Sequence, residues 1–251
     1  MHKPNKSPTN PAGRLLEILK RARAGSAPTT IAKGFAQIFD IGSDDFGELF
    51  RHLSLAEEAA DQVSTLLKLS GNESFQRTYL ECLPRIKRIF NVRHLDANWQ
   101  QHIKDTLFDS ELRDLQYCSD LLSEHFPEEL IEADQLMELL KEVEALYDDV
   151  WTCDLDDDLK KIVLENLQTI KNAVNDYKIR GADGLQDALA TIIGTAAMVR
   201  PIDTTSGSNT FERLSKVVDM LAKLLNLAKS AKPLLKAGAE VYRRLLPPGS
   251  A

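Results

Sequence analysis

Apolar residues recur at intervals of three and four positions along almost the whole chain, and strict alternation of apolar and polar residues is rare. This spacing places apolar side chains on one face of an α-helix, whereas a half-buried strand would need a period of two. The pattern is clearest over 156–179, at Leu159, Ile162, Val163, Leu167, Ile170, Val174 and Tyr177. The spacing therefore predicts an all-α protein with a multi-helix, bundle-like body.

Glycine, proline and capping residues predict where the helices begin and end. Gly25 and Gly181 follow apolar stripes and are expected to stop helices, because glycine adopts the left-handed backbone of a helix end at little cost. Pro28 and Ser43 precede such stripes and are expected to open helices. The helix over 183–199 has many small residues and few charges, so we expect it to be central and buried. The expected helices span about 12–24, 28–39, 43–69, 74–90, 95–107, 110–125, 128–152, 156–179, 183–199, 210–231 and 234–246.

One run of residues has the composition of a linker. It is the sequence PIDTTSGSNT over 201–210, where proline, glycine, serine and threonine gather between two apolar stripes. Residues 1–11 are rich in proline, asparagine, lysine and serine, and we expect them to be disordered. The predicted organisation is a disordered N-terminus over 1–11, a helical body over 12–200, a linker over 201–210 and a basic amphipathic C-terminal segment over 211–251.

Charge is distributed very unevenly along the chain. Residues 105–184 include 22 acidic and 7 basic residues, whereas residues 211–246 include 8 basic and 3 acidic residues. Blocks of like charge repel one another unless an opposite face compensates them, so both blocks suggest surfaces with assigned partners. The net charge of −7 argues against nucleic acid as a partner of the whole chain.

The C-terminal segment is the strongest candidate for a binding surface. Its apolar residues follow helical spacing, and its lysines lie off that face. A basic amphipathic helix can fill a groove on a protein partner or lie on an anionic membrane surface. Alternatively, the apolar stripe packs on the helical body, with its basic residues against the acidic block. The candidate partner- or membrane-binding residues are Leu214, Lys216, Val217, Val218, Leu221, Lys223, Leu224, Leu225 and Lys229.

These patterns favour a non-enzymatic helical interaction or regulatory protein that acts by exposing or burying residues 211–246. In the mechanism we expect, the basic stripe rests on the acidic block over 105–184, and a protein partner or an anionic membrane competes for it. A second hypothesis is a membrane-acting bacterial effector of the defence or toxin type, whose C-terminal segment enters the membrane interface. The long helices would also suit self-association.

The number and spacing of the cysteines indicate the cellular compartment of the protein. Cys82, Cys118 and Cys153 are odd in number and widely spaced, so we expect neither a disulfide framework nor a thiolate metal site. Free thiols fit a reducing compartment, and no apolar run is long enough for a membrane-spanning helix. We therefore expect a cytoplasmic protein, which the C-terminal segment could place at the periphery of a membrane.

A run of aspartates has part of the spacing of a calcium-binding loop. Asp154, Asp156 and Asp158 would occupy its first, third and fifth positions, and Glu165 its last. Leu159 stands where the sharp turn of such a loop needs glycine. Acidic residues also favour the start of a helix, where they satisfy free N–H groups and the helix dipole. We adopt this second interpretation and expect no metal ion and no cofactor.

The sequence RIFNVRH, from Arg88 to His94, is similar to the Arg-x(4–6)-His element of HEPN-type ribonucleases, which are all-helical. The resemblance implies that His94 is the catalytic base and that Arg88 contacts phosphate. Ile89 departs from the family pattern, which usually has a polar residue directly after the arginine. The alternative is a basic patch at a helix end, where the helix dipole favours cations. An HEPN-like ribonuclease is thus a further hypothesis for the function.

The stretch DYKIRGADGL over 176–185, with the helix before it, resembles a helix–turn–helix corner of uncharacterised bacterial all-helical proteins. The resemblance covers about residues 156–190 and implies a bacterial source but no known activity. Gly181 is expected to hold the positive φ of the corner, and Leu185 to begin the next apolar face.

Overall fold

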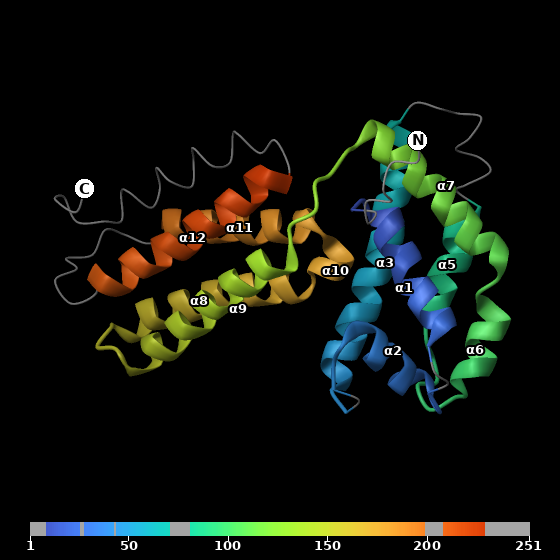
Figure 1. Cartoon of the computed structure of the whole chain (residues 1–251). Helices are drawn as coiled ribbons and strands as arrows, with labels where there is room; N and C mark the ends of the chain where they lie inside the picture. The colour runs from blue at the N-terminus through green and yellow to red at the C-terminus, as the bar shows by residue number, and fades with distance from the viewer. Residues whose placement is uncertain (1–8, 26–27, 43, 71–80, 199–207, 229–251) are drawn as a thin grey trace. The chain divides into compact units, whose positions relative to one another are not determined.

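The regular structure of the described residues is helical. The computed structural model describes residues 9–25, 28–42, 44–70, 81–198 and 208–228 (Figure 1). In these residues every regular element is an α-helix, and β-type pairing is limited to an isolated bridge between Thr30 and Asn98. The all-α fold predicted from the spacing of apolar residues is therefore confirmed.

The chain divides into two compact units. The first unit consists of Met1–Glu128 and Lys178–Gly181, and the second consists of Glu129–Tyr177 and Ala182–Ala251. The chain therefore leaves the first unit after Glu128, returns to it for one short segment, and leaves it again.

Side-chain caps fix the starts of several helices in the first unit. Asn10, Thr30 and Asn98 each accept a hydrogen bond from a backbone N–H group three residues further on, which satisfies a donor that the helix leaves free. The described helices of this unit are α1 (Pro11–Ala24), α2 (Ile31–Phe39), α3 (Phe46–Leu69), α5 (Cys82–Phe90), α6 (Trp99–Thr106), α7 (Asp109–His125) and most of α10 (Tyr177–Arg180).

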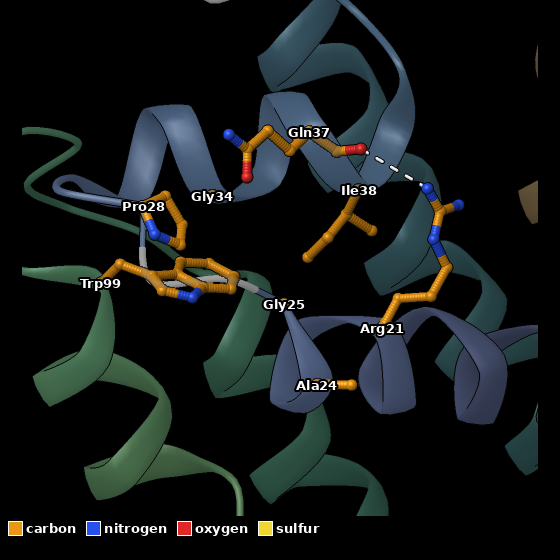
Figure 2. Close-up of a pocket in the computed structure, with 8 residues that line it drawn as sticks. All are labelled: Arg21, Ala24, Gly25, Pro28, Gly34, Gln37, Ile38 and Trp99. Atoms are coloured by element: carbon orange, nitrogen blue, oxygen red, sulfur yellow. Dashed lines mark hydrogen bonds between the residues drawn. The ribbon is translucent and has the colours of Figure 1, made fainter.

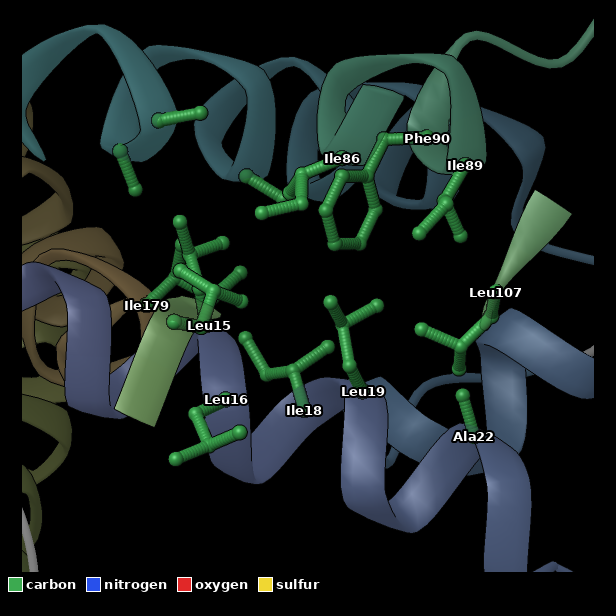
Figure 3. Packing of buried hydrophobic residues seen from close by; sticks show 14 of the residues in the cluster. Leu15, Leu16, Ile18, Leu19, Ala22, Ile86, Ile89, Phe90, Leu107 and Ile179 are labelled. Carbon is green, nitrogen blue, oxygen red and sulfur yellow. The ribbon is translucent and has the colours of Figure 1, made fainter. Parts of the chain in front are cut away.

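The core of the first unit is built around α1, which packs against α2, α3 and α7. Leu19 of α1 points toward Ile86 and Phe90 of α5 in the interior (Figure 3). In the same core, the ring of Phe35 meets the ring of Trp99 edge to face, with 5.1 Å between their centroids. This geometry is favourable for aromatic pairs and joins α2 to α6.

A buried arginine, Arg14 of α1, binds the segment Lys178–Gly181, which returns to the first unit and is called the returning segment below. Its Nε donates a hydrogen bond to the carbonyl of Ile179 at 2.9 Å, and its Nη2 donates to the carbonyl of Arg180 at 3.1 Å. Its Nη1 donates to Oε2 of Glu128 at 2.9 Å, and both side chains of this ion pair are largely buried. A Cβ atom added at Gly181 would collide with Nη1 of this arginine. Arg14 therefore contacts residues beside each point at which the chain passes from one unit to the other.

The described part of the second unit is a four-helix bundle. Its described helices are α8 (Ala133–Thr152), α9 (Asp157–Asn175), α11 (Ala182–Met198) and α12 (Ser208–Ala228). Each helix contacts two neighbours, in the order α8, α9, α11, α12 and back to α8, so the four enclose one apolar core (Figure 1). Gly181, with a φ of 60°, forms the corner between α10 and α11, as the sequence predicts.

The structure differs from the predicted helices in several details. Helix α3 begins at Phe46, where Asp45 and not Ser43 provides the cap, and the helix predicted over 156–179 breaks at Asp176. Helix α2 begins at Ile31, not at Pro28, because Thr30 provides the side-chain cap. Helix α11 is not central, since Ala190 and Gly194 are exposed to solvent. In a ring of four helices, each helix keeps one face outside the core, and small residues can occupy that face.

The observed division of the chain differs from the expected one. The helical body predicted over 12–200 is shared between two units, and α12 belongs to the second unit and not to a separate C-terminal segment. The linker is predicted from a composition rich in glycine, serine and threonine. The chain instead leaves the first unit at Phe126-Pro127-Glu128, where there is no run of glycine or serine. Residues 1–8 and 199–207, most of the predicted linker, and the predicted helix over 234–246 lie outside the described residues.

A buried carboxylate, Glu111, joins α7 to α5. Its side chain accepts hydrogen bonds from Nε of Arg85 at 2.7 Å, from Oγ of Ser110 at 2.9 Å and from the N–H of Phe108 at 3.1 Å. Burial by itself raises the pKa of Glu111, but the hydrogen bonds to the charged form outweigh burial and hold the pKa below its ordinary value.

This pKa shift predicts an acid-dependent loss of stability. Because the pKa of Glu111 is lower in the folded state, its contribution is complete above the pKa of the unfolded chain and is lost as the pH falls below it. We expect Glu111→Gln to lower the free energy of unfolding by about 1–3 kcal/mol at neutral pH and to have less effect near pH 3. Urea unfolding at both pH values, with the exposed Glu124→Gln on the same helix as control, measures this; an equal cost at both pH values would contradict it.

Candidate interaction surface

The apolar face of the C-terminal segment lies in the core of the four-helix bundle. The predicted contact residues on this face are between 0 and 8% exposed, and they pack with apolar side chains of α8, α9 and α11. Lys216 and Lys223 are exposed on the opposite side of α12, as their position off the stripe predicts. Lys229 and the rest of 229–246 lie outside the described residues. The buried residues of the predicted set are Leu214, Val217, Val218, Leu221, Leu224 and Leu225.

Apolar packing, more than charge, holds α12 in place. Among the described residues, the ion pair between Arg213 and Asp149 of α8 is the one that joins α12 to the acidic block. An exposed ion pair contributes about 0–1 kcal/mol, whereas burial of one large apolar side chain contributes about 1.5–3 kcal/mol. The arrangement therefore matches the packed alternative considered for this segment, with charge in a minor role.

Arg88 and His94, the residues similar to the ribonuclease element, line different hollows of the first unit. Arg88 lies in the last turn of α5 and lines a hollow of about 610 Å³ together with Lys87 and Arg93. His94 lies in the loop after α5 and lines a second hollow, of about 460 Å³. The two side chains are both exposed and belong to a basic patch at the end of α5.

The aspartate run caps a helix. The side chain of Asp156 accepts hydrogen bonds from the backbone N–H groups of Asp158 and Leu159, at 3.1 and 3.4 Å, and so begins α9. This is the capping interpretation of the run. Among the described residues, no cluster of three or more histidine, cysteine, aspartate or glutamate side chains could hold a metal ion.

A shallow hollow beside Trp99 has little to offer a ligand. It measures about 300 Å³ and lies between the end of α1 and α2, with Pro28 near the face of the indole ring (Figure 2). Nη2 of Arg21 donates a hydrogen bond to the carbonyl of Gln37 at 3.4 Å across it. Its other walls are mainly small residues, Ala24, Gly25 and Gly34, so few groups point into it.

The hollow that includes His94 has a different character, because two half-exposed phenylalanines line it. Phe46 is 49% exposed and Phe50 is 53% exposed, and they lie one turn apart at the start of α3. The opposite wall is the loop after α5, which hydrogen bonds anchor to the start of α2. The N–H of Ile31 donates to the carbonyl of Ala97, and the N–H of Ala32 to the carbonyl of Leu95. The apolar hollow is thus lined by α3, by the start of α2 and by a loop anchored to α2.

Basic residues also line this apolar hollow. They are Lys33, Arg93 and His94, and none of their side chains has a hydrogen-bond or ion-pair partner in the described part of the chain. Arg93 also lines the basic hollow of Arg88, so the two hollows adjoin at this residue. Asp44, Asp96 and, in the basic hollow, Glu57 are acidic residues on the same rim. We call the combined surface the Phe–Arg groove; it consists of Lys33, Phe46, Phe50, Arg88, Arg93 and His94.

Sequence reasoning identified Arg88 and His94 but missed the phenylalanines. The signal was present, because the start of α3 has apolar side chains at Phe46, Leu49, Phe50 and Leu53, a stripe wider than one buried face requires. Leu49 and Leu53 are buried, and the phenylalanines form the exposed edge of the stripe. Sequence alone does not distinguish which edge of a wide stripe remains in solvent.

Comparison of the chain with protein families, with characterised proteins and with solved structures finds no significant match. None of the described helices combines the length and the apolar content that crossing a membrane requires.

Proposed function

We propose that this protein is a non-enzymatic helical interaction protein, which binds an acidic segment of a protein partner in the Phe–Arg groove. The observation that carries the proposal is the pair of half-exposed phenylalanines beside cations that have no partner in the described residues. The complementary ligand has one large apolar side chain for the hollow and carboxylates for Arg88 and Arg93.

The physical argument rests on two contributions. Exposed aromatic side chains in a hollow are typical of binding sites, because their burial by a partner removes apolar area from water. Arginine side chains on the rim attract carboxylates and favour one orientation of the ligand. The apolar hollow therefore supports affinity, and the basic hollow supports selectivity for acidic ligands.

The C-terminal segment is proposed as a second contact of the same protein. Lys216 and Lys223 are exposed on α12, and their side chains have no acidic partner in the described residues. They support contact between the outer edge of α12 and an anionic protein or membrane surface. The membrane-effector alternative depends on the apolar face of α12, which is occupied while the bundle is closed. It is therefore the weaker proposal.

A peptide-binding experiment tests the groove. The probe is a labelled acidic peptide of about 16 residues with one tryptophan, and the control peptide has lysine in place of each aspartate. We expect saturable binding of the acidic peptide alone, with backbone amide shifts at Phe50 and Arg93 in NMR spectra. Phe50→Ala and Arg93→Glu should each weaken binding about tenfold, and binding should weaken as salt rises.

Two control variants outside the groove test whether the loss of binding is specific to the groove. Leu69→Ala removes an exposed apolar side chain from the far end of α3, and Lys20→Glu reverses an exposed charge on α1. Both variants should bind the acidic peptide as the wild type does. Equal binding of the acidic and basic peptides, or amide shifts that avoid the groove, would overturn the proposal.

A further inference from the structure

We propose, on the basis of the function proposed above, that the segment which fills the Phe–Arg groove belongs to a second copy of this chain. The segment is the corner between α8 and α9, where an exposed tryptophan stands among aspartates. Copies of the chain would then associate head to tail, with the first unit of one copy bound to the second unit of the next.

The ligand surface is centred on Trp151 at the end of α8. Trp151 is 59% exposed, and the ring of Tyr147 meets it edge to face, with 6.3 Å between centroids. The indole ring is therefore supported on one side by Tyr147 and open to solvent elsewhere. It is a large apolar side chain without a place in the bundle core, the kind of residue that dominates binding at protein interfaces.

Carboxylates surround this tryptophan. Asp148, Asp154, Asp157 and Asp158 are exposed, and their side chains have no partner in the described residues. The neighbouring aspartates are already engaged: Asp149 pairs with Arg213 and Asp156 caps α9. Lys160 is the nearby base, and its Nζ donates to the carbonyl of Trp151 at 3.5 Å. We call this surface the Trp–Asp corner; it consists of Tyr147, Asp148, Trp151, Asp154, Asp157 and Asp158.

The Phe–Arg groove and the Trp–Asp corner are complementary in their apolar side chains and in their charges. The groove presents two phenylalanines and unpaired cations, and the corner presents one tryptophan and unpaired carboxylates. The balance of basic and acidic residues in each unit agrees with this pairing. The first unit has 18 basic and 18 acidic residues, whereas the second has 13 basic and 20 acidic residues. Contact between two second units would therefore be repulsive, and contact between a first and a second unit would not.

The geometry of such a contact determines its stoichiometry. The groove and the corner lie on different units, so a contact between two copies uses one groove and one corner and leaves one of each free. Contacts of this heterologous kind continue to larger assemblies, or close into a ring, unless a copy lacks one of the two surfaces.

The test mixes two variants of the full chain, each defective in one surface. Wild-type protein should show concentration-dependent association in sedimentation velocity, and the association should weaken at least severalfold as salt rises from about 50 to about 300 mM. Phe50→Ala alone and Trp151→Ala alone should remain monomeric. An equimolar mixture of the two should form a 1:1 heterodimer and nothing larger, because one intact groove meets one intact corner.

Controls separate the proposal from loss of folding and from non-specific adhesion. Both variants should keep the wild-type far-ultraviolet circular dichroism and the wild-type unfolding midpoint, because both side chains are half exposed. Arg93→Glu and Asp154→Lys should each be monomeric alone if carboxylates of the corner meet the basic rim, and their mixture should associate, because the intact corner of the first variant meets the intact groove of the second.

Three outcomes would overturn the inference. They are a wild-type protein that remains monomeric up to about 0.5 mM, self-association of Phe50→Ala equal to that of the wild type, and a mixture of variants that stays monomeric. If the acidic peptide binds the groove of a strictly monomeric wild type, the inference fails while the proposed function stands. If neither the peptide nor a second copy binds, both fail.

Discussion

Replacing Arg14 by alanine is expected to lower the free energy of unfolding of the first unit by about 3–5 kcal/mol, the cost typical of removing one partner from a buried ion pair. The loss leaves the carboxylate of Glu128 largely buried without its arginine, and it leaves the carbonyls of Ile179 and Arg180 without the guanidinium donor. These groups would need water or a local rearrangement to be satisfied, and either change loosens the returning segment.

The two tryptophans allow the effect to be measured unit by unit. Trp99 is buried in the first unit and Trp151 is exposed in the second. In a Trp151→Phe background, fluorescence during urea unfolding therefore reports the first unit. Arg23→Ala is the matched control, because Arg23 is also an arginine of α1 but forms an exposed ion pair with Asp109. It should leave the midpoint unchanged. An Arg14→Ala midpoint equal to that of this control would show that the buried contacts contribute little.

Replacing Leu221 by alanine is expected to destabilise the second unit by about 2–5 kcal/mol, through lost burial and the cavity that remains. Leu221 has no exposed area and lies on the face of α12 that fills the bundle. If α12 is a permanent member of the bundle, the substitution should speed amide exchange in α8, α9 and α11 as well as in α12, because the four helices share one core.

Hydrogen–deuterium exchange followed by mass spectrometry measures this, with Lys223→Ala as control on the exposed side of α12. The control should exchange as the wild type does. Rapid exchange in α12 of the wild type, with no further effect of Leu221→Ala, would indicate a helix that leaves the bundle readily. That result would favour the regulatory mechanism in which residues 211–246 become exposed.

Local and periodic features of the fold could be predicted from the sequence. The stripe from Leu159 to Tyr177 predicts one long helix, and α9 covers most of it, although the helix breaks at Asp176 before α10. Gly181 predicts the corner before α11, because few other residues adopt its positive φ without strain. Such features depend on neighbours in the sequence, which the sequence displays directly.

Features that depend on distant residues could not be predicted. The stripe on α12 indicates an apolar face but not what covers it, so a bundle core and a foreign partner were equally compatible with Leu221 and its neighbours. Arg14 stands beside Leu15 and Leu16 like any polar residue next to an apolar stripe, and its acceptors on Glu128, Ile179 and Arg180 lie more than a hundred residues away. Trp151 and Phe50 were missed because exposure of an aromatic side chain depends on packing between helices.

The returning segment also has a consequence for the order in which the chain folds as it is synthesised. Arg14 and its acceptor on Ile179 are 165 residues apart, so a ribosome has already released α8 and α9 before the last piece of the first unit emerges. N-terminal domains usually fold first during synthesis. Here the N-terminal unit must wait with an incomplete core, because Ile179 belongs to it, while half of the later bundle is already outside the exit tunnel.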